Sequence, residues 1–389
     1  MLYILMHKDD PVVVVSIDQF GQMTDVNKKV YNPALLPLRH QSVPNGLVKW
    51  WKERAVPLSR HGIEQFMQER GFEGPEEYLV KNLGLSLSDT YWIKPIDSNF
   101  SWSDINLYEN DFRSDFFSTP GTDEDREIPA YSANSSLQGD VEKTWAIMNG
   151  ERVLIKGNSS HQSSESLNEV LASEIYKRQG YDNYVPYELT RIKNVQYQFG
   201  CICKNFTTPN IELVPAYDLI TSQKKDNQIS FFQHMTDIAI RLGVSRESIQ
   251  YDIDMQLLGD YVLSGNDRHY NNIGFLRDTD SLRLVRMAPI YDSGRSLFVG
   301  TEIPKQMSDF LKIQTNSFAN NERKLLSYVQ DKSVLDVTKL PSPDWVKKLY
   351  EQDPEQSEDR INSIVWAYEK KIEMLREIQL GKDPYQSLF

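Results

Sequence analysis

The sequence predicts an α+β protein with a small β-rich lobe, a helical lobe after it, and an extra α+β subdomain in front of both. Three observations predict this class. A β-branched run followed by a turn lies at residues 12–22, an Asn-Gly pair separates two strand patterns within 144–156, and the pattern beyond residue 207 is mainly helical. The chain has 389 residues, more than one hydrophobic core usually holds, so several packed units are expected.

The extra subdomain is expected to span residues 1–118, with short helices after the hairpin. Apolar side chains within Gly46 to Ala55 indicate one helix, and those within Pro75 to Leu83 indicate another. Between them, Ser59 is a suitable N-cap for a helix that stops at Gly71.

A domain boundary is expected near the end of this subdomain. Residues 98–125 are rich in Asp, Ser and aromatic side chains, and 118–123 read Ser-Thr-Pro-Gly-Thr-Asp, which is the composition of a linker. The β-rich lobe is then expected to span 119–206. Its Asn-Gly pair predicts a two-residue hairpin turn, and the apolar spacing over 166–179 before Gly180 predicts a helix.

The helical lobe is expected to span residues 207–389. Apolar positions over 230–242 have helical spacing, and Ser245 is a suitable N-cap for the next helix. The clearest apolar stripe runs from Ser357 to Leu380, directly before Gly381.

Charge and composition argue against several classes of protein. The net charge of −12 and the pI near 5.1 argue against direct binding of nucleic acid, although they are compatible with a local basic pocket for phosphate. The apolar run Met1 to Met6 is too short for a signal sequence, and no stretch approaches the about eighteen apolar residues of a membrane span. Cys201 and Cys203 have no second Cys or His pair at zinc spacing. We therefore expect both cysteines to be structural and the protein to be cytoplasmic. Metal binding by the two cysteines is the alternative.

The most informative segment is Ser264 to Phe275, between a predicted long helix and a short strand. Phosphoryl transfer needs a carboxylate that orients the attacking hydroxyl and takes its proton, and a carboxamide oxygen that holds magnesium. Asp267 and Asn272 supply this pair. Asp292, isolated after an apolar run, is the candidate for the second magnesium ligand. Two protein ligands suffice because magnesium also keeps water and phosphate oxygens.

Each of these residues also has a plainer interpretation. Asp267 and Arg268 can form an ion pair within the loop, Asn272 can be a turn residue, and residues 292–294 can form an ordinary turn. Their order along the chain, with a suitable lysine upstream, favours the catalytic interpretation.

That lysine is Lys156, at the end of the second strand of the Asn-Gly hairpin, where its ammonium would reach the α and β phosphates of ATP. A lysine in this role is held by a carboxylate of the following helix. Glu169 lies early in that helix, and Glu174 is the second choice. A surface lysine and solvated glutamates are the alternatives.

Small and polar residues precede this hairpin, where backbone N–H groups could surround phosphates. With one glycine, the segment is a weak glycine-rich loop when taken alone. Its candidate nucleotide-binding residues are Ser135, Ser136, Leu137, Gln138 and Gly139.

Two further positions are assigned to the nucleotide site. Residues 200–206 fall between the two expected lobes, so the backbone around Cys203 is expected to bind the adenine edge, with a plain core strand as the alternative. His269 stands beside Asp267, where it is expected to fix the loop by hydrogen bonding rather than to act as an acid or base. Arg268 is expected to offset phosphate charge or to pair with a loop carboxylate.

These motifs resemble those of the HipA family of kinases. The resemblance covers about residues 130–300 and is carried by Ser136 to Lys143, Leu154-Ile155-Lys156, Asn168-Glu169, Asn266-Asp267-Arg268-His269 with Asn272, and Ala288-Pro289-Ile290-Tyr291-Asp292. It implies a bilobed protein-kinase-like fold, ATP and Mg²⁺ as cofactors, and phosphorylation of serine or threonine hydroxyls of proteins. It also implies autophosphorylation of Ser135 or Ser136, which would eject the phosphate loop and switch the enzyme off.

The resemblance is loose over the first 118 residues, so the substrate and the partner do not follow from it. The best-known members of the family are toxins held by a DNA-binding antitoxin, and this acidic chain would reach DNA only through such a partner. Two alternatives stay open. One is a lipid or small-molecule kinase, against which the acidic charge and the lack of a basic amphipathic helix count. The other is a catalytically silent nucleotide-binding module, against which the joint retention of Lys156, Asp267, Asn272 and Asp292 counts.

Overall fold

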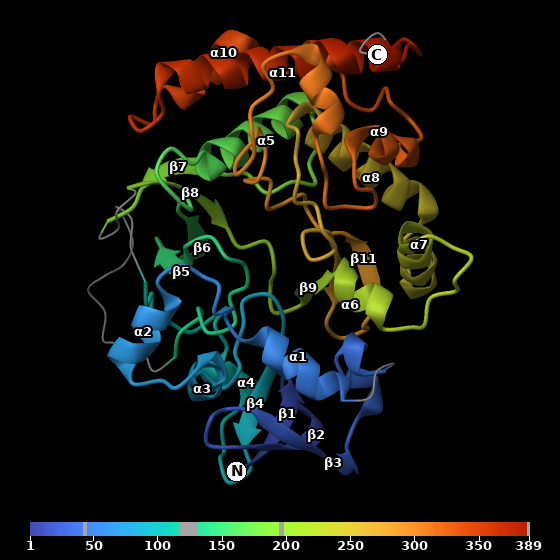
Figure 1. Ribbon diagram of the computed structural model, residues 1–389. Coiled ribbons are helices and arrows are strands. Elements are labelled where there is room, and N and C mark those ends of the chain that lie inside the picture. The colour runs from blue at the N-terminus through green and yellow to red at the C-terminus, as the bar shows by residue number, and fades with distance from the viewer. Residues whose placement is uncertain (42–44, 117–130, 194–197, 387–389) are drawn as a thin grey trace.

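The computed structural model describes residues 1–41, 45–116, 131–193 and 198–386. These residues form a mixed structure of three antiparallel sheets and a largely helical C-terminal part (Figure 1), which confirms the expected α+β class. The expected linker at 118–123 lies outside the described residues. Within the described ranges, no helix combines the length and the apolar character that a membrane crossing requires.

The N-terminal sheet has four antiparallel strands in the order β3-β2-β1-β4. They are β1 (Leu2–His7), β2 (Asp10–Ile17), β3 (Met23–Val30) and β4 (Tyr91–Pro95). The expected hairpin is confirmed as β2 and β3. The apolar run before it adds β1, which pairs with β4 from Tyr3↔Pro95 to His7↔Tyr91. The sheet is therefore completed by a strand that is far along the chain from the other three.

Four short helices accompany this sheet: α1 (Gly46–Arg54), α2 (Ile63–Arg70), α3 (Pro75–Lys81) and α4 (Trp102–Ile105). The N-cap role expected for Ser59 is wrong. Helix α2 begins after Gly62, whose φ of 76° is left-handed, and Ser59 Oγ instead donates to Asp140 Oδ1 at 2.5 Å. Gly71 ends α2 as expected, at a φ of 71° that suits glycine.

The second sheet has the order β5-β6-β8-β7, with β5 (Lys143–Met148), β6 (Glu151–Lys156), β7 (Glu188–Arg191) and β8 (Phe199–Lys204). Asn149 and Gly150, at φ of 52° and 79°, form the predicted turn between β5 and β6. Helix α5 (Glu165–Gln179) follows and ends at Gly180, as predicted. These elements place Lys156 at the end of β6 and Glu169 in the first turns of α5.

The third sheet has the order β11-β10-β9, with β9 (Ile211–Pro215), β10 (Gly274–Asp278) and β11 (Leu284–Met287). The remaining helices are α6 (Ala216–Thr221), α7 (Phe231–Leu242), α8 (Arg246–Val262), α9 (Glu322–Leu325), α10 (Pro343–Tyr350) and α11 (Glu358–Gln379). Short 3-10 helices are η1 (Pro33–Leu35), η2 (Leu38–Gln41), η3 (Met307–Lys312), η4 (Leu326–Tyr328) and η5 (Val337–Lys339). The helices predicted at 230–242, after Ser245 and at 357–380 are confirmed as α7, α8 and α11, and a serine caps each one.

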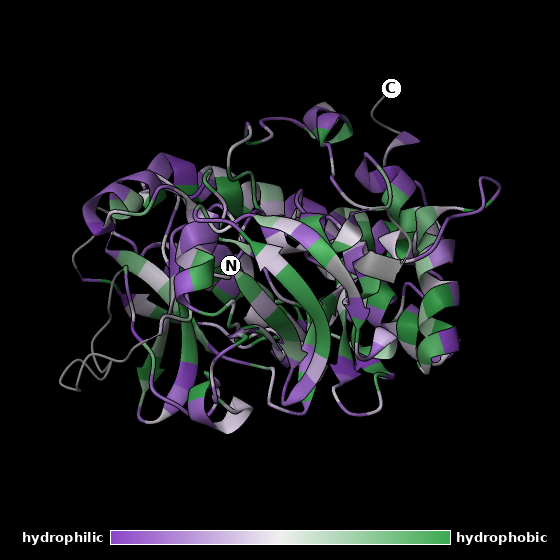
Figure 2. Cartoon of the chain, turned by 90° about the horizontal axis from the view of Figure 1, so that it is seen from below, coloured by the Kyte–Doolittle hydropathy of each residue, from purple (hydrophilic) through white to green (hydrophobic). Residues whose placement is uncertain are grey.

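Two large apolar cores hold these elements together. One gathers side chains of α5, α8 and α11, and the other runs from β1 and β2 through α1 to Trp145 and Ile147 of β5. Figure 2 shows apolar segments along the strands around the N-terminus and hydrophilic segments on many peripheral loops and helices. Each fully buried Leu or Ile contributes about 1.5–3 kcal/mol. The second core therefore packs the N-terminal sheet firmly against the sheet that carries Lys156.

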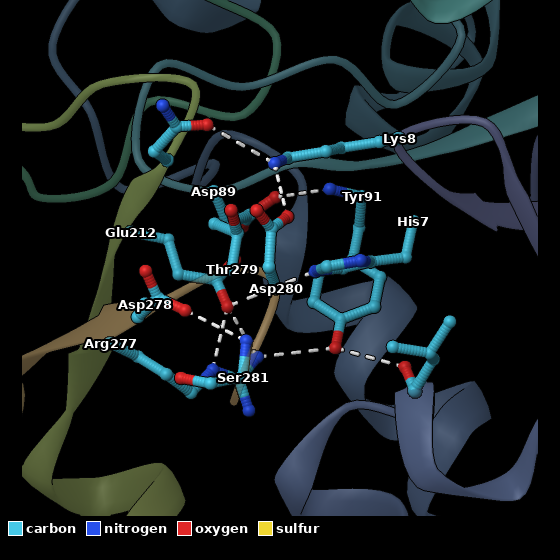
Figure 3. Close-up of polar contacts among 12 residues, drawn as sticks. His7, Lys8, Asp89, Tyr91, Glu212, Arg277, Asp278, Thr279, Asp280 and Ser281 are labelled. Carbon is cyan, nitrogen blue, oxygen red and sulfur yellow. Dashed lines mark hydrogen bonds and ion pairs between the residues drawn. The ribbon is translucent and has the colours of Figure 1, made fainter. Parts of the chain in front are cut away.

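A buried polar cluster joins the N-terminal sheet to β9 and β10 (Figure 3). Arg277 Nε donates to Glu212 Oε1 at 2.6 Å, Arg277 also donates to the Tyr91 hydroxyl at 3.2 Å, and His7 Nε2 lies 4.0 Å from Glu212. Burial acts to raise the pKa of Glu212, but Arg277 and His7 together outweigh it and hold that pKa below its ordinary value. Charged groups are thus paired across the contact between the N-terminal sheet and the rest of the chain.

Candidate active site

Lys156 lies at the centre of the candidate site. Its Nζ donates to Glu169 Oε1 at 2.6 Å and to Asp292 Oδ1 at 2.7 Å. Lys156 and Glu169 are buried, at 6% and 2% exposure, whereas Asp292 is partly exposed. Glu169 Oε2 also accepts a hydrogen bond from Ser293 N at 2.9 Å. Glu169 therefore holds both the lysine and the backbone next to Asp292.

Opposite charges decide the protonation of this group. Burial acts to lower the pKa of Lys156, but Asp292 and Glu169 outweigh it and hold that pKa well above its ordinary value. Burial acts to raise the pKa of Asp292, and the ammonium groups of Lys156 and Lys143 hold it below its usual range. Lys156 and Asp292 are therefore both charged at neutral pH, which suits contacts to phosphate and to a metal cation.

Arg268 fastens two loops of the site together. Its guanidinium forms two hydrogen bonds of 2.9 Å with Asp260 of α8. It also donates to the backbone carbonyls of Asn272 at 3.1 Å and Tyr291 at 2.5 Å. Because these two carbonyls share one donor, the loop that carries Asn272 lies beside the segment that carries Asp292.

Asp267 has a partly exposed carboxylate in the same loop as Asn272. Its carboxylate lies 3.9 Å from His269 Nε2 and 3.9 Å from Arg295 Nε, and 30% of the side chain is exposed. Among the described residues none donates a hydrogen bond to this carboxylate. The neighbouring Arg268 points toward α8 instead, so the ion pair considered for Asp267 and Arg268 does not form. The carboxylate is thus available to a hydroxyl group.

His269 is held within the same loop. Its Nδ1 accepts a hydrogen bond from Asn271 N at 3.3 Å, and its backbone carbonyl accepts one from Asn272 N at 2.8 Å. These contacts hold His269 within the loop, with its Nε2 3.9 Å from the Asp267 carboxylate.

Asn272 and Asp292 present oxygen atoms that suit magnesium. Asn272 Nδ2 donates to the Asp267 backbone carbonyl at 2.8 Å, which leaves the amide oxygen as the free ligand atom. Asp292 uses one oxygen on Lys156 and keeps the other, and its φ of 57° is unusual for an aspartate. A carboxylate and a carboxamide are hard donors, and magnesium completes its shell with water and phosphate oxygens. The residues present therefore fit this ion.

The expected phosphate loop is packed against residues from the N-terminal part of the chain. Val56 N donates to the Ser135 carbonyl at 2.9 Å, and Ser136 Oγ donates to the Leu85 carbonyl at 2.8 Å. Ser135 is fully buried, and its hydroxyl makes no hydrogen bond within the described part of the chain. Neither serine hydroxyl is open to a second molecule in this conformation.

The second half of the loop is held by side chains of the same subdomain. Arg60 donates to the carbonyls of Leu137 and Gly139. Gln138 Nε2 donates at 2.9 Å to two backbone carbonyls at the end of α1. Arg60 and the end of α1 therefore hold this half of the loop in place.

Lys143 belongs to the site, although sequence reasoning assigned it no role. It is buried and lies directly opposite Lys156 in the register of β5 with β6. A Cβ atom on Gly139, where φ is 96°, would come within 2.4 Å of Lys143 Nζ, so this ammonium lies against the loop. Burial lowers the pKa of Lys143 to about 8, although Asp292 acts to raise it. The turn at 149–150 fixes the register, so the pairing of the two lysines could have been read from the sequence.

Cys203 lies in β8, next to the connection toward the helical part. Its strand pairs with β6 at Leu154↔Cys203, and its thiol is buried in a small apolar cluster with Tyr187, Phe206 and Tyr291. Burial raises the pKa of this thiol to about 12, so the thiol is unreactive at neutral pH.

The structure brings Lys156, Glu169, Asn272 and Asp292 to one place, with Asp267 in the same loop as Asn272. Glu174, the second choice for the lysine partner, instead pairs with Arg178 at 2.7 Å on the surface of α5.

No protein-family model matches the sequence, and no curated protein matches it significantly. Among solved structures, the proinflammatory kinase CtkA of Helicobacter pylori is similar over 62% of this chain and 97% of that chain, with 18% sequence identity and a TM-score of 0.43.

Proposed function

We propose that the chain is a magnesium-dependent phosphotransferase that moves the γ-phosphate of ATP to a hydroxyl group, as a HipA-like serine/threonine protein kinase. The contact of Lys156 with both Glu169 and Asp292, at 2.6 and 2.7 Å, carries this proposal. A lysine that is held by a helix carboxylate and lies beside a metal-binding aspartate is the arrangement with which kinases bind ATP.

The nucleotide would lie between the phosphate loop and the catalytic-loop candidates. Lys156 and Lys143 would supply positive charge to its phosphates, and the backbone around Cys203 would contact the adenine. The loop from Ser135 to Gly139 borders the phosphates through Gly139, which lies against Lys143. The N-terminal subdomain holds this loop in place and so contributes to the site from a distance.

Chemistry would take place at Asp267, Asn272 and Asp292. Asn272 and Asp292 would hold magnesium, which when bound supplies positive charge to the β and γ phosphate oxygens. Asp267 would orient the acceptor hydroxyl and take its proton while the hydroxyl oxygen forms a bond to the γ-phosphorus. The bond between that phosphorus and the β–γ bridging oxygen breaks, and ADP leaves with the bridging oxygen.

The direct test is Asp267→Asn in the full chain. Wild-type protein with Mg-ATP is expected to label itself or a protein in cell lysate with phosphate. Asp267→Asn should lower this transfer by at least about 100-fold, because it removes a general base, and it should keep ATP binding. Phosphoproteomics of treated lysate identifies the acceptor as Ser, Thr or neither.

Asp344→Asn, at an exposed position in α10, is the matched control and should label like wild type. Transfer by Asp267→Asn at the control rate contradicts the role of this base. Transfer to small molecules without any protein acceptor contradicts the protein-kinase part of the proposal.

A further inference from the structure

A second hollow lies beside the candidate site and is not used by the proposed chemistry. It is a polar pocket of about 420 Å³ formed by three segments of the chain. They are residues 160–163, between β6 and α5, residues 298–302, which follow Asp292, and Arg360 in the first turn of α11. Two of these segments therefore continue directly from elements that carry Lys156 and Asp292.

The pocket lies on the acceptor side of the site. Gly300 lines it, and a Cβ atom on Gly300 would lie 3.3 Å from an Arg295 guanidinium nitrogen. The Nε of the same guanidinium is 3.9 Å from the Asp267 carboxylate. One arginine side chain therefore spans from the pocket to the carboxylate that would receive the acceptor hydroxyl. A peptide with its hydroxyl at Asp267 would pass this pocket.

Arg360 makes the pocket attractive to an anion. No hydrogen bond or ion pair joins its guanidinium to another described residue, and its Nε is buried without a partner. Two carboxylates lie near the pocket, and neither contacts the Arg360 guanidinium among the described residues. Glu355 pairs with His161 at 3.1 Å, and Glu302 is an exposed residue of the pocket wall. A buried Nε without a partner is costly, so an incoming carboxylate or phosphate group that reaches this half-buried guanidinium would satisfy it.

We propose that this pocket is a specificity subsite that binds an acidic side chain of the protein substrate, close in sequence to the acceptor hydroxyl. The inference rests on the proposed kinase function. Arg360 would pair with the acidic side chain, and the exposed hydroxyls of Ser160 and Thr301 would add hydrogen bonds. Because the chain carries a net charge of −12, its surface as a whole repels acidic peptides, and selection depends on this local cation.

Peptide binding tests the subsite separately from catalysis. Two fluorescent peptide libraries, each with a central serine, carry glutamate or glutamine at random flanking positions. Binding to the full chain with Mg-ADP is measured by anisotropy. Wild type should bind the glutamate library about tenfold more tightly, the value of one charge-assisted contact. Arg360→Gln should abolish this preference, and Arg360→Lys should keep most of it. Arg376→Gln, at an exposed position near the other end of α11, should bind like wild type.

The same libraries with Mg-ATP separate the two proposals. Glutamate-selective binding that depends on Arg360 but occurs without phosphate transfer supports the subsite and contradicts the kinase function. Phosphate transfer with equal binding of both libraries, or an Arg360→Gln variant that keeps the wild-type preference, overturns the subsite and leaves the kinase function intact. If transfer occurs, Arg360→Gln should raise KM for glutamate peptides about tenfold and leave kcat unchanged, because Arg360 touches no reacting atom.

Discussion

Lys143 and Lys156 face each other across β5 and β6, and their surroundings differ. Lys156 has two carboxylate partners, whereas Lys143 has no hydrogen bond or ion pair with any described residue. Burial therefore lowers the pKa of Lys143 to about 8, while the pKa of Lys156 stays well above its ordinary value. Of the two, Lys143 is the residue whose charge changes within the range of ordinary assays.

Affinity for ATP is expected to fall as pH rises through about 8, because Lys143 loses its proton there. In Lys143→Arg the charge persists, since arginine titrates above about 12, and this fall should be absent. Calorimetric titration with ATP between pH 7 and about 9.5 measures the affinity of the wild type and of the Lys143→Arg variant. A wild-type affinity that stays constant over this range would falsify the role of Lys143.

Deprotonation of Lys143 changes the free energy of unfolding in the opposite direction to the affinity for ATP. An unfolded lysine keeps its proton to about pH 10.4, so between about 8 and that value the unfolded chain binds more protons than the folded one. The contribution of Lys143 to the free energy of unfolding therefore rises with pH across this window.

Among the elements, the loop from 135 to 139 depends most on a distant part of the chain. Arg60→Met removes the hydrogen bonds to the carbonyls of Leu137 and Gly139 and leaves two acceptors unpaired, at a cost of about 1–3 kcal/mol each. Hydrogen exchange of this loop, measured by mass spectrometry, should become faster. If Ser135 or Ser136 is an autophosphorylation site, its labelling should increase as well.

Arg70→Met, at an exposed position of the nearby α2, should leave loop exchange unchanged and serves as the control. Equal exchange in the Arg60 and Arg70 variants would show that the loop is held by other contacts.

Local sequence patterns were sufficient for most helices and for the β5–β6 turn, because apolar periodicity and turn residues act over a few positions. The pairing of β1 with β4 was missed because it joins segments that are far apart in the chain. In the site, the spacing of Asp267, Asn272 and Asp292 indicated their proximity. The bonds from Arg268 to Asp260 that bring the loops together could not be predicted, because α8 supplies the carboxylate and only tertiary packing directs Arg268 to it.

For the whole molecule, the polar cluster in Figure 3 links the N-terminal sheet to β9 and β10. Arg277→Met would leave the buried Glu212 carboxylate without its main partner, at a cost of about 3–5 kcal/mol. Urea unfolding should show this loss as a lower midpoint. A second change, Glu212→Gln, should recover part of it because it removes the uncompensated charge.

Arg286→Met provides the comparison for that experiment. Arg286 lies on the neighbouring β11 and pairs at 3.5 Å with Asp182, which is 88% exposed. Loss of this surface pair should cost at most about 1 kcal/mol. Equal midpoints for the Arg277 and Arg286 variants would mean that the buried cluster contributes little.

The same cluster limits which chimeras of this chain with another protein would be stable. A chimera that joins its first hundred or so residues to the remainder of a different protein would set Tyr91 and His7 against a surface that lacks Arg277 and Glu212. The buried polar atoms of these two residues would then lack hydrogen-bond partners, and the chimera would be less stable. Stable recombined chains are therefore expected to keep both parts from the same parent, and substitutions at these four positions are expected to occur together.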